Sequence, residues 1–194
     1  MPSIRPFLIT AALSLSASQM PALASADDPL IEEAKALIKE FAGQLQSELK
    51  SAIQANGPVQ AIAVCKERAP AIAAELSESS GWEIGRTSLK VRNAALNSPD
   101  DWEIQVLQSF EERKAAGEPV EQLSFAEIIQ GEDGGVFRLM KAIPTQDLCL
   151  ACHGDHVSEP VLKALAEYYP QDQARGFKAG DIRGAFSLAK PLAE

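Results

Sequence analysis

Two cysteines and a histidine stand close together towards the C-terminal end of the chain. Cys149, Cys152 and His153 form the pentapeptide C-x-x-C-H, which is the attachment signature of c-type haem. Two thiols three positions apart can each add across one vinyl group of the same porphyrin, and the adjacent histidine is then directed at the iron. The motif therefore predicts one covalently bound haem c, with His153 as the proximal ligand.

Two other chemistries could use the same residues. A redox dithiol would need a thioredoxin-like strand–helix–strand pattern around the motif, and the flanking sequence shows none. A zinc site would add His156, but Cys152 and His153 are adjacent and would both have to turn towards one small ion. The spacing therefore favours haem attachment.

The ligand on the opposite side of the iron would decide what such a haem does. A methionine thioether is neutral and favours ferrous iron, whereas a cysteine thiolate is anionic, stabilises ferric iron and lowers the reduction potential. Outside the predicted leader, Met140 is the only methionine and Cys65 the only spare cysteine. His156 follows His153 too closely to reach the other face. From the residues alone, Met140, Cys65 and an open position remain three equal alternatives.

The first 26 residues have the pattern of a secretory signal peptide. Arg5 supplies the positive charge, residues 7–15 form a short apolar core, and small residues permit cleavage after Ala24 or Ala26. The apolar stretch is roughly half of the ~20 residues needed to cross a bilayer. We therefore expect a soluble, exported, periplasmic protein whose residues 27–194 form one haem-binding domain. Thioethers to haem form outside the cytoplasm, so the leader and the motif support each other.

Composition excludes several other classes. The chain has 194 residues, of which 46% are hydrophobic, and this is typical of a globular domain. Its formal charge is −9, so nucleic acids and anionic membrane surfaces would repel it. No later segment is long and apolar enough to span a membrane. Three cysteines are too few for a disulfide scaffold.

Helical and strand patterns both occur in the chain. Apolar residues recur at steps of three and four from Ile31 to Ile53, and Asn56-Gly57-Pro58 should end that helix and start a second one. Ser98 should cap a later helix with Pro99 at its first position. The remaining expected elements are a helix carrying Cys65 and restarting at Pro70, an extended segment 82–92, a hairpin of 123–129 with 136–143, a helical turn 149–153, a helix 160–169 and a strand 182–189. This order predicts an α+β domain with N-terminal helices packed on a small antiparallel sheet.

Four segments of the chain resemble a family of exported single-haem c-type domains of PAS-like fold. These are AIAVCKERAP (61–70), RTSLKVRNAALNSPDDWE (86–103), CLACHG (149–154) and GFKAGDIRGAFSL (176–188). Members of this family occur as stand-alone cyanobacterial-type cytochromes and as periplasmic input domains of sensor kinases. The chain departs from the family pattern between Asn93 and Pro99, where the family has a shorter turn with proline.

The resemblance implies a PAS-like fold and a cysteine as the distal ligand, here Cys65 with Met140 as the alternative. It also places Arg86 and Arg92 near the haem, where a guanidinium could pair with a propionate. Periplasmic redox sensing, or sensing of CO or NO bound to the reduced iron, is the function that it implies. A separate redox or signalling protein would then be the partner.

Two other functions remain open from the sequence. An electron carrier would use its acidic surface to meet basic partners. A haem peroxidase would need acid–base residues near the motif, and none is placed for O–O cleavage. We therefore expect a protein that is not an enzyme.

Overall fold

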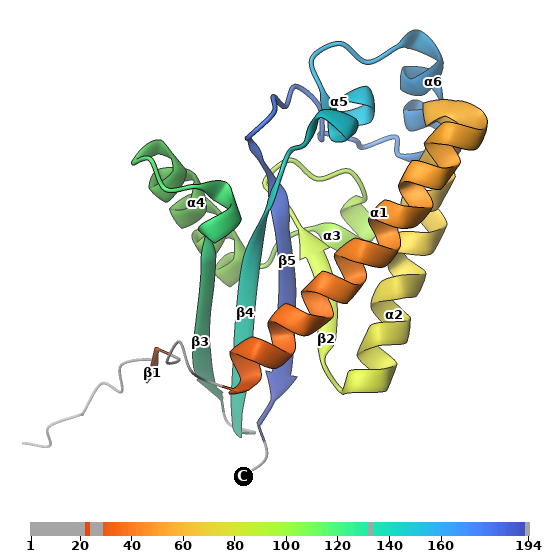
Figure 1. Cartoon of the computed structure of the whole chain (residues 1–194). Coiled ribbons are helices and arrows are strands. Elements are labelled where there is room, and N and C mark those ends of the chain that lie inside the picture. The colour runs from red at the N-terminus through yellow and green to blue at the C-terminus, as the bar shows by residue number, and fades with distance from the viewer. Residues whose placement is uncertain (1–21, 24–28, 132–133, 193–194) are drawn as a thin grey trace, which may run out of the picture.

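The computed structural model describes residues 22–23, 29–131 and 134–192. Figure 1 shows one twisted sheet with helices α1 and α2 along it, and with α5 and α6 beyond one of its ends. Within the predicted leader, only the two-residue strand β1 (Ala22–Leu23) is described, and it pairs with strand β3 (Ser124–Gly131). Both predicted cleavage points, at Ala24 and Ala26, lie outside the described residues.

The sheet is antiparallel throughout. Its other strands are β2 (Glu83–Thr87), β4 (Gly134–Pro144) and β5 (Ile182–Pro191), and its order is β1-β3-β4-β5-β2. The predicted hairpin is confirmed as β3 and β4, which pair from Ser124↔Lys141 to Gly131↔Gly134. The C-terminal strand β5 lies between β4 and β2, so it joins β2 to the hairpin of β3 and β4 in one layer.

Helices cover both faces of this sheet, as the alternation of side chains along β4 shows. Phe137 and Leu139 pack into the core under α1 (Pro29–Ala63) and α2 (Ala69–Ser80). The neighbouring Met140 and Ala142 face the opposite core, under α4 (Asp101–Ala115). Successive strand residues point to opposite faces, so one strand supplies both cores. The expected α+β class is confirmed.

The N-terminal helical region is interrupted where the sequence predicts. Gly57 has φ 77° and ψ 177°, which is not helical, and Pro58 follows it. A π-helical turn, Val64–Arg68, then joins α1 to α2, and Pro70 lies in the first turn of α2. Cys65 therefore sits on a π-turn rather than on the regular helical face that periodicity predicts. Such turns are rare and are frequent at functional sites.

Two expected elements differ from the structure. The extended segment ends at Thr87, because the Ser88 hydroxyl donates to the Arg183 carbonyl and accepts from the Lys90 amide, which replaces ladder bonding. Helix α4 begins at Asp101 with Asp100 as its N-cap, so Ser98 is not the cap. Asp100 and Glu103 form a reciprocal capping box, which satisfies two amides and displaces the start by two residues.

The C-terminal helices gather at the end of the sheet nearest the π-turn (Figure 1). Helix α5 (Asp147–His153) carries the C-x-x-C-H motif, and α6 (Glu159–Tyr168) follows it. Ile62 of α1 packs with Val161 and Leu165 of α6, and Cys152 joins this cluster. The short helices α3 (Ala94–Asn97) and η2 (Val120–Gln122) complete the chain. Within the described segments, no helix is long and apolar enough to cross a membrane.

Gly184 permits the close approach of β5 to the end of β2. Its φ is 155°, and a Cβ there would lie 2.3 Å from the Thr87 carbonyl oxygen. We expect Gly184→Ala to lower the free energy of unfolding by about 3 kcal/mol, because the side chain would force the strands apart. Chemical denaturation measures this loss. The matched control is Gly43→Ala at an exposed position of α1, where a Cβ meets nothing within 4 Å. Because alanine favours the helix, this change should raise the free energy of unfolding by roughly 1 kcal/mol. Equal unfolding midpoints for the two variants would contradict the prediction.

Candidate functional site

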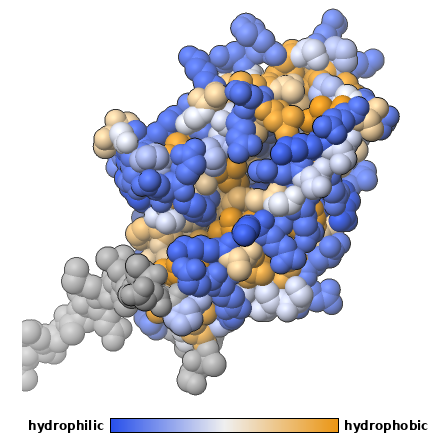
Figure 2. Space-filling view, in the orientation of Figure 1, coloured by the Kyte–Doolittle hydropathy of each residue, from blue (hydrophilic) through white to orange (hydrophobic). Residues whose placement is uncertain are grey.

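Helix α5 holds the two motif cysteines on one short turn. Cys149 and Cys152 are three residues apart, so their side chains share a helix face, and both are half-buried with free thiols. The Cys149 sulfur accepts a hydrogen bond from the Gln146 amide, 3.4 Å away. Gly154 ends the helix, and a Cβ there would lie 2.7 Å from the Leu150 carbonyl oxygen. Figure 2 shows apolar side chains gathered around α5 within a largely hydrophilic surface.

The contact between His153 and the Ala174 carbonyl favours the tautomer that leaves Nε2 free to bind a metal. The Nδ1 of His153 lies 2.7 Å from the Ala174 carbonyl oxygen. A carbonyl only accepts hydrogen bonds, so this contact is a hydrogen bond when Nδ1 carries the proton and Nε2 keeps its lone pair. Histidines that bind metals commonly donate their other ring N–H to a carbonyl in this way. The geometry therefore leaves Nε2 as the available ligand atom.

The surroundings of His153 also keep its ring neutral. Burial lowers the pKa of His153 well below its usual value, and the positive charges of Arg183 and Arg92 lower it further. Phe177 closes one side, with its ring edge-on to the imidazole at a centroid distance of 6.2 Å. A neutral imidazole is the form that coordinates a metal ion.

Arg92, predicted to lie near the cofactor, contacts the motif directly. Its guanidinium donates to the carbonyls of Cys152 and Ala174 at 2.6 and 3.1 Å, and it lies 3.3 Å from Nε2 of His153. It also pairs with Asp172 at 3.1 Å, and both side chains are less than a tenth exposed. Arg92 is thus already neutralised by a buried carboxylate.

Arg183 is a site residue that sequence reasoning missed. Its Nε lies 3.1 Å from Nδ1 and 3.3 Å from Nε2 of His153, which places the guanidinium against the ring. Burial, together with Arg92 and Arg86, lowers the pKa of Arg183 to about 10, so it stays charged at neutral pH. The residue lies in the family-like segment 176–188, but nothing local distinguishes it from a solvated strand residue.

Cys65 joins this group from the other end of the chain. Burial raises the pKa of its thiol, while the charges of Arg86, Arg92 and Arg183 oppose that rise and Cys149 adds to it. Burial also raises the pKa of Cys152, Arg92 opposes that rise, and Cys65 and Cys149 add to it. Cys152 packs against the cluster that contains Ile62, three residues before Cys65, and the Lys66 ammonium lies over the Tyr168 ring, 4.5 Å from its centroid. The fold therefore brings the π-turn with Cys65 towards a motif that begins 84 residues later in the chain.

Arg86, also predicted near the cofactor, is the third arginine of the site, after Arg92 and Arg183. Its guanidinium lies over the ring of Phe41, 5.3 Å from the centroid, on the face covered by α1. Burial lowers its pKa, and the nearby Cys65 and Tyr169 oppose that change. Among the described residues, no carboxylate pairs with Arg86 or with Arg183.

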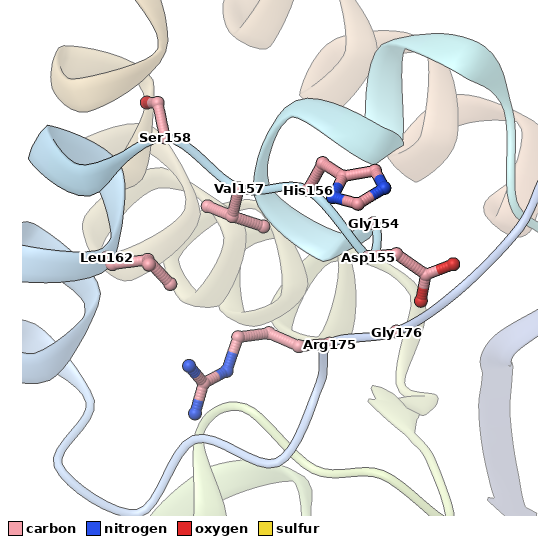
Figure 3. Close-up of a pocket in the computed structure, with 8 residues that line it drawn as sticks. All are labelled: Gly154, Asp155, His156, Val157, Ser158, Leu162, Arg175 and Gly176. Atoms are coloured by element: carbon pink, nitrogen blue, oxygen red, sulfur yellow. The ribbon is translucent and has the colours of Figure 1, made fainter.

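The other candidates that the sequence offered lie away from this group. Met140 is fully buried in the core under α4, on the opposite face of the sheet from Arg86. His156 is exposed in the loop after the motif, beside a hollow of about 600 Å³. Figure 3 shows that hollow, which is lined by Gly154–Ser158, Leu162, Arg175 and Gly176, and by none of the three cysteines. Within the described segments, no three His, Cys, Asp or Glu side chains could hold one metal ion together, so a zinc site is not supported.

Comparison with protein families decides the relationship of this chain. The model of the Tll0287-like family matches residues 22–191. The chain belongs to the Tll0287-like family. The matched region contains Cys65, the C-x-x-C-H motif and the three arginines Arg86, Arg92 and Arg183. The whole site therefore lies within the Tll0287-like domain.

A solved structure shares the fold of this Tll0287-like chain. The crystal structure of the cyanobacterial heme-protein Tll0287 superposes with a TM-score of 0.64 at 22% sequence identity, and covers 87% of this chain and 99% of that one. No curated protein matches the chain. The predicted PAS-like α+β fold, with N-terminal helices on a small antiparallel sheet, is therefore confirmed, as is the predicted family.

Proposed function

We propose that this Tll0287-like protein is an exported cytochrome with one covalent haem c, which acts in redox or small-ligand sensing. The observation that carries the proposal is the convergence of Cys65 with the C-x-x-C-H motif in one positively charged site. Cys152 packs against the cluster that contains Ile62, three residues before Cys65, and Arg92 and Arg183 contact His153. The related solved protein is a heme-protein, which supports the same cofactor. A binding and redox role follows, rather than a catalytic one.

The residues present fit haem c. Cys149 and Cys152 have free thiols for the two thioether bonds, and His153 offers Nε2 as proximal ligand. Haem carries two propionates, and the site offers two half-buried guanidinia without carboxylate partners among the described residues, Arg86 and Arg183. We propose that these two arginines bind the propionates, since guanidinium–carboxylate pairs are strong when buried. When bound, the haem iron supplies a one-electron redox centre that can also take a diatomic gas.

Cys65 is the residue that suits a sensing role. It comes from the π-turn, whereas His153 comes from α5 and is tied separately to Ala174. Cys65 can therefore leave its position without disturbing the hydrogen bonds that hold His153. We propose that Cys65 is the distal ligand in the oxidised protein and is displaced after reduction, which lets CO or NO bind.

The proposal is tested on protein exported with its leader and matured by a periplasmic haem-attachment apparatus. We expect the mass of the mature chain to rise by one haem and the spectrum to show haem c. We also expect carbon monoxide to change the spectrum only after reduction. A colourless product or an unchanged mass would overturn the cofactor assignment.

The alternative function is electron transfer between periplasmic proteins. The net charge of −9 favours it, because an acidic surface attracts basic redox partners. A carrier would keep the same iron ligands in both oxidation states and would not bind carbon monoxide. Spectra of the oxidised and reduced protein, with and without the gas, therefore separate the two functions.

A further inference from the structure

We propose that Arg92 and Asp172 form a buried positioning pair for His153, which fixes its ring tautomer and tunes the metal through opposite charges. The inference concerns how the chain holds its proximal ligand, and it rests on the proposed function only where a bound metal is measured. Neither residue lies in the C-x-x-C-H motif. Arg92 precedes His153 by 61 residues and Asp172 follows it by 19.

The Ala174 peptide is the point on which both residues act. Its carbonyl accepts from His153 Nδ1 at 2.7 Å and from Arg92 Nη2 at 3.1 Å. Its amide donates to Asp172 Oδ1 at 2.9 Å, and the same oxygen accepts from Arg92 Nε at 3.1 Å. Arg92 therefore binds the Ala174 carbonyl that orients the imidazole, and Asp172 binds the amide of the same residue.

Arg92 also acts on the other end of the imidazole. In the haem-free chain its Nη1 lies 3.3 Å from His153 Nε2, and Arg92 can only donate, so this contact requires a lone pair on Nε2, which is the lone pair that the proposed function gives to the iron. The contact at Nδ1 with Ala174 requires a proton there. The contacts with Ala174 and Arg92 therefore favour the same tautomer, whereas Arg183 Nε lies 3.1 Å from Nδ1 and 3.3 Å from Nε2 and so faces both ring nitrogens.

The pair also ties together the segments that carry the ligand. Arg92 donates to the Cys152 carbonyl at 2.6 Å, which attaches it to α5. The loop after Asp172 is bonded to the same helix end, through Phe177 N to the His153 carbonyl at 2.9 Å and Gly176 N to the Gly154 carbonyl at 3.1 Å. With side chains 8% and 5% exposed, Arg92 and Asp172 act where water screens little.

The first test measures the tautomer of His153 in the haem-free, folded chain. The chain contains only two histidines, so ¹⁵N NMR of the imidazoles can be assigned with a His156→Gln variant. We expect the wild-type His153 ring to be protonated at Nδ1. In Arg92→Gln and in Asp172→Asn, the ratio of this tautomer to the other should fall by roughly tenfold, as for the loss of one buried hydrogen bond.

The second test measures the midpoint potential of the matured protein. Arg92→Gln removes a positive charge and should lower the potential, whereas Asp172→Asn removes a negative charge and should raise it. The double variant should lie between the two. Arg92→Lys keeps the charge without the planar fork, so its potential should stay closer to wild type than that of Arg92→Gln.

Arg175→Gln is the matched control. Arg175 also pairs with Asp172, at 3.4 Å, but it is half exposed, and among the described residues its side chain forms no hydrogen bond with His153, Cys152 or the Ala174 carbonyl. It should leave both the tautomer ratio and the potential unchanged. A merely structural pair would move the potential in the same direction for Arg92→Gln and Asp172→Asn, which would overturn the proposal.

An unchanged tautomer ratio in both single variants would also overturn it. Absence of haem from the wild-type protein would instead refute the proposed function and leave the NMR result decisive for His153. If a single variant fails to fold, Arg92→Lys supplies the same NMR comparison. A wild-type tautomer ratio in Arg92→Lys would then contradict the proposal that the planar guanidinium of Arg92 fixes the tautomer.

Discussion

Replacing Cys149 and Cys152 together by serine is expected to abolish covalent attachment of haem. The two thiols lie on one turn of α5, and each forms one of the two thioether bonds in the proposed function. Serine keeps the size of the side chain but cannot form a thioether. Intact-protein mass after export and maturation should therefore show no added haem, whereas the wild-type chain gains one.

The matched control for this double variant is Cys65→Ser. It removes the third cysteine of the same site but neither of the attachment thiols, so the mass of one haem should remain. Retention of that mass in the Cys149→Ser/Cys152→Ser variant would mean that Cys65 or another group holds the cofactor. The C-x-x-C-H interpretation would then be wrong.

Replacing Cys65 by alanine should change the spectrum and the potential of the matured protein. An anionic thiolate stabilises ferric iron, so its loss should raise the midpoint potential by on the order of a few hundred millivolts. The low-spin EPR signal of the ferric protein should change as well, because the distal ligand is gone. Cys65 lies beside three arginines, so its removal also leaves positive charge that disfavours the ferric state.

Met140→Leu is the control for this second variant. Met140 is fully buried in the core under α4, and leucine has a similar volume, so the fold should tolerate the change. Its EPR spectrum and potential should match the wild type. Cys65→Ala and Met140→Leu thus test the two candidate ligands directly. An unchanged low-spin signal in Cys65→Ala, with a changed one in Met140→Leu, would assign the distal position to Met140.

The elements that follow from local patterning are the ones that sequence reasoning predicts well. The helix break at Gly57, the hairpin of β3 and β4 and the helical turn of the motif all lie where the sequence places them. Their causes are positive φ, strand alternation and turn residues, which act over a few neighbours. The misplaced cap at Ser98 shows the limit, because Asp100 offers a competing capping box two residues on.

The identity of the attachment residues could also be read from the chain alone. The chemistry of C-x-x-C-H depends on two thiols and an imidazole within five consecutive residues, and no distant contact is needed to recognise it. The same holds for the leader-like composition of residues 1–26, which remains a prediction. Cys65 could be chosen over Met140 only through the family resemblance, because periodicity describes both equally as core residues.

Only the tertiary structure shows how the site is built. It places Met140 on the far face of the sheet, adds Arg183 to the site, and pairs Arg92 with Asp172 rather than leaving it free for a propionate. The contacts of Arg183 with His153 and of Arg92 with Asp172 join residues 30 and 80 positions apart in the chain. Local pattern carries no information about such pairs, because the closure of the sheet by β5 and the docking of α5 against the π-turn determine which charges meet.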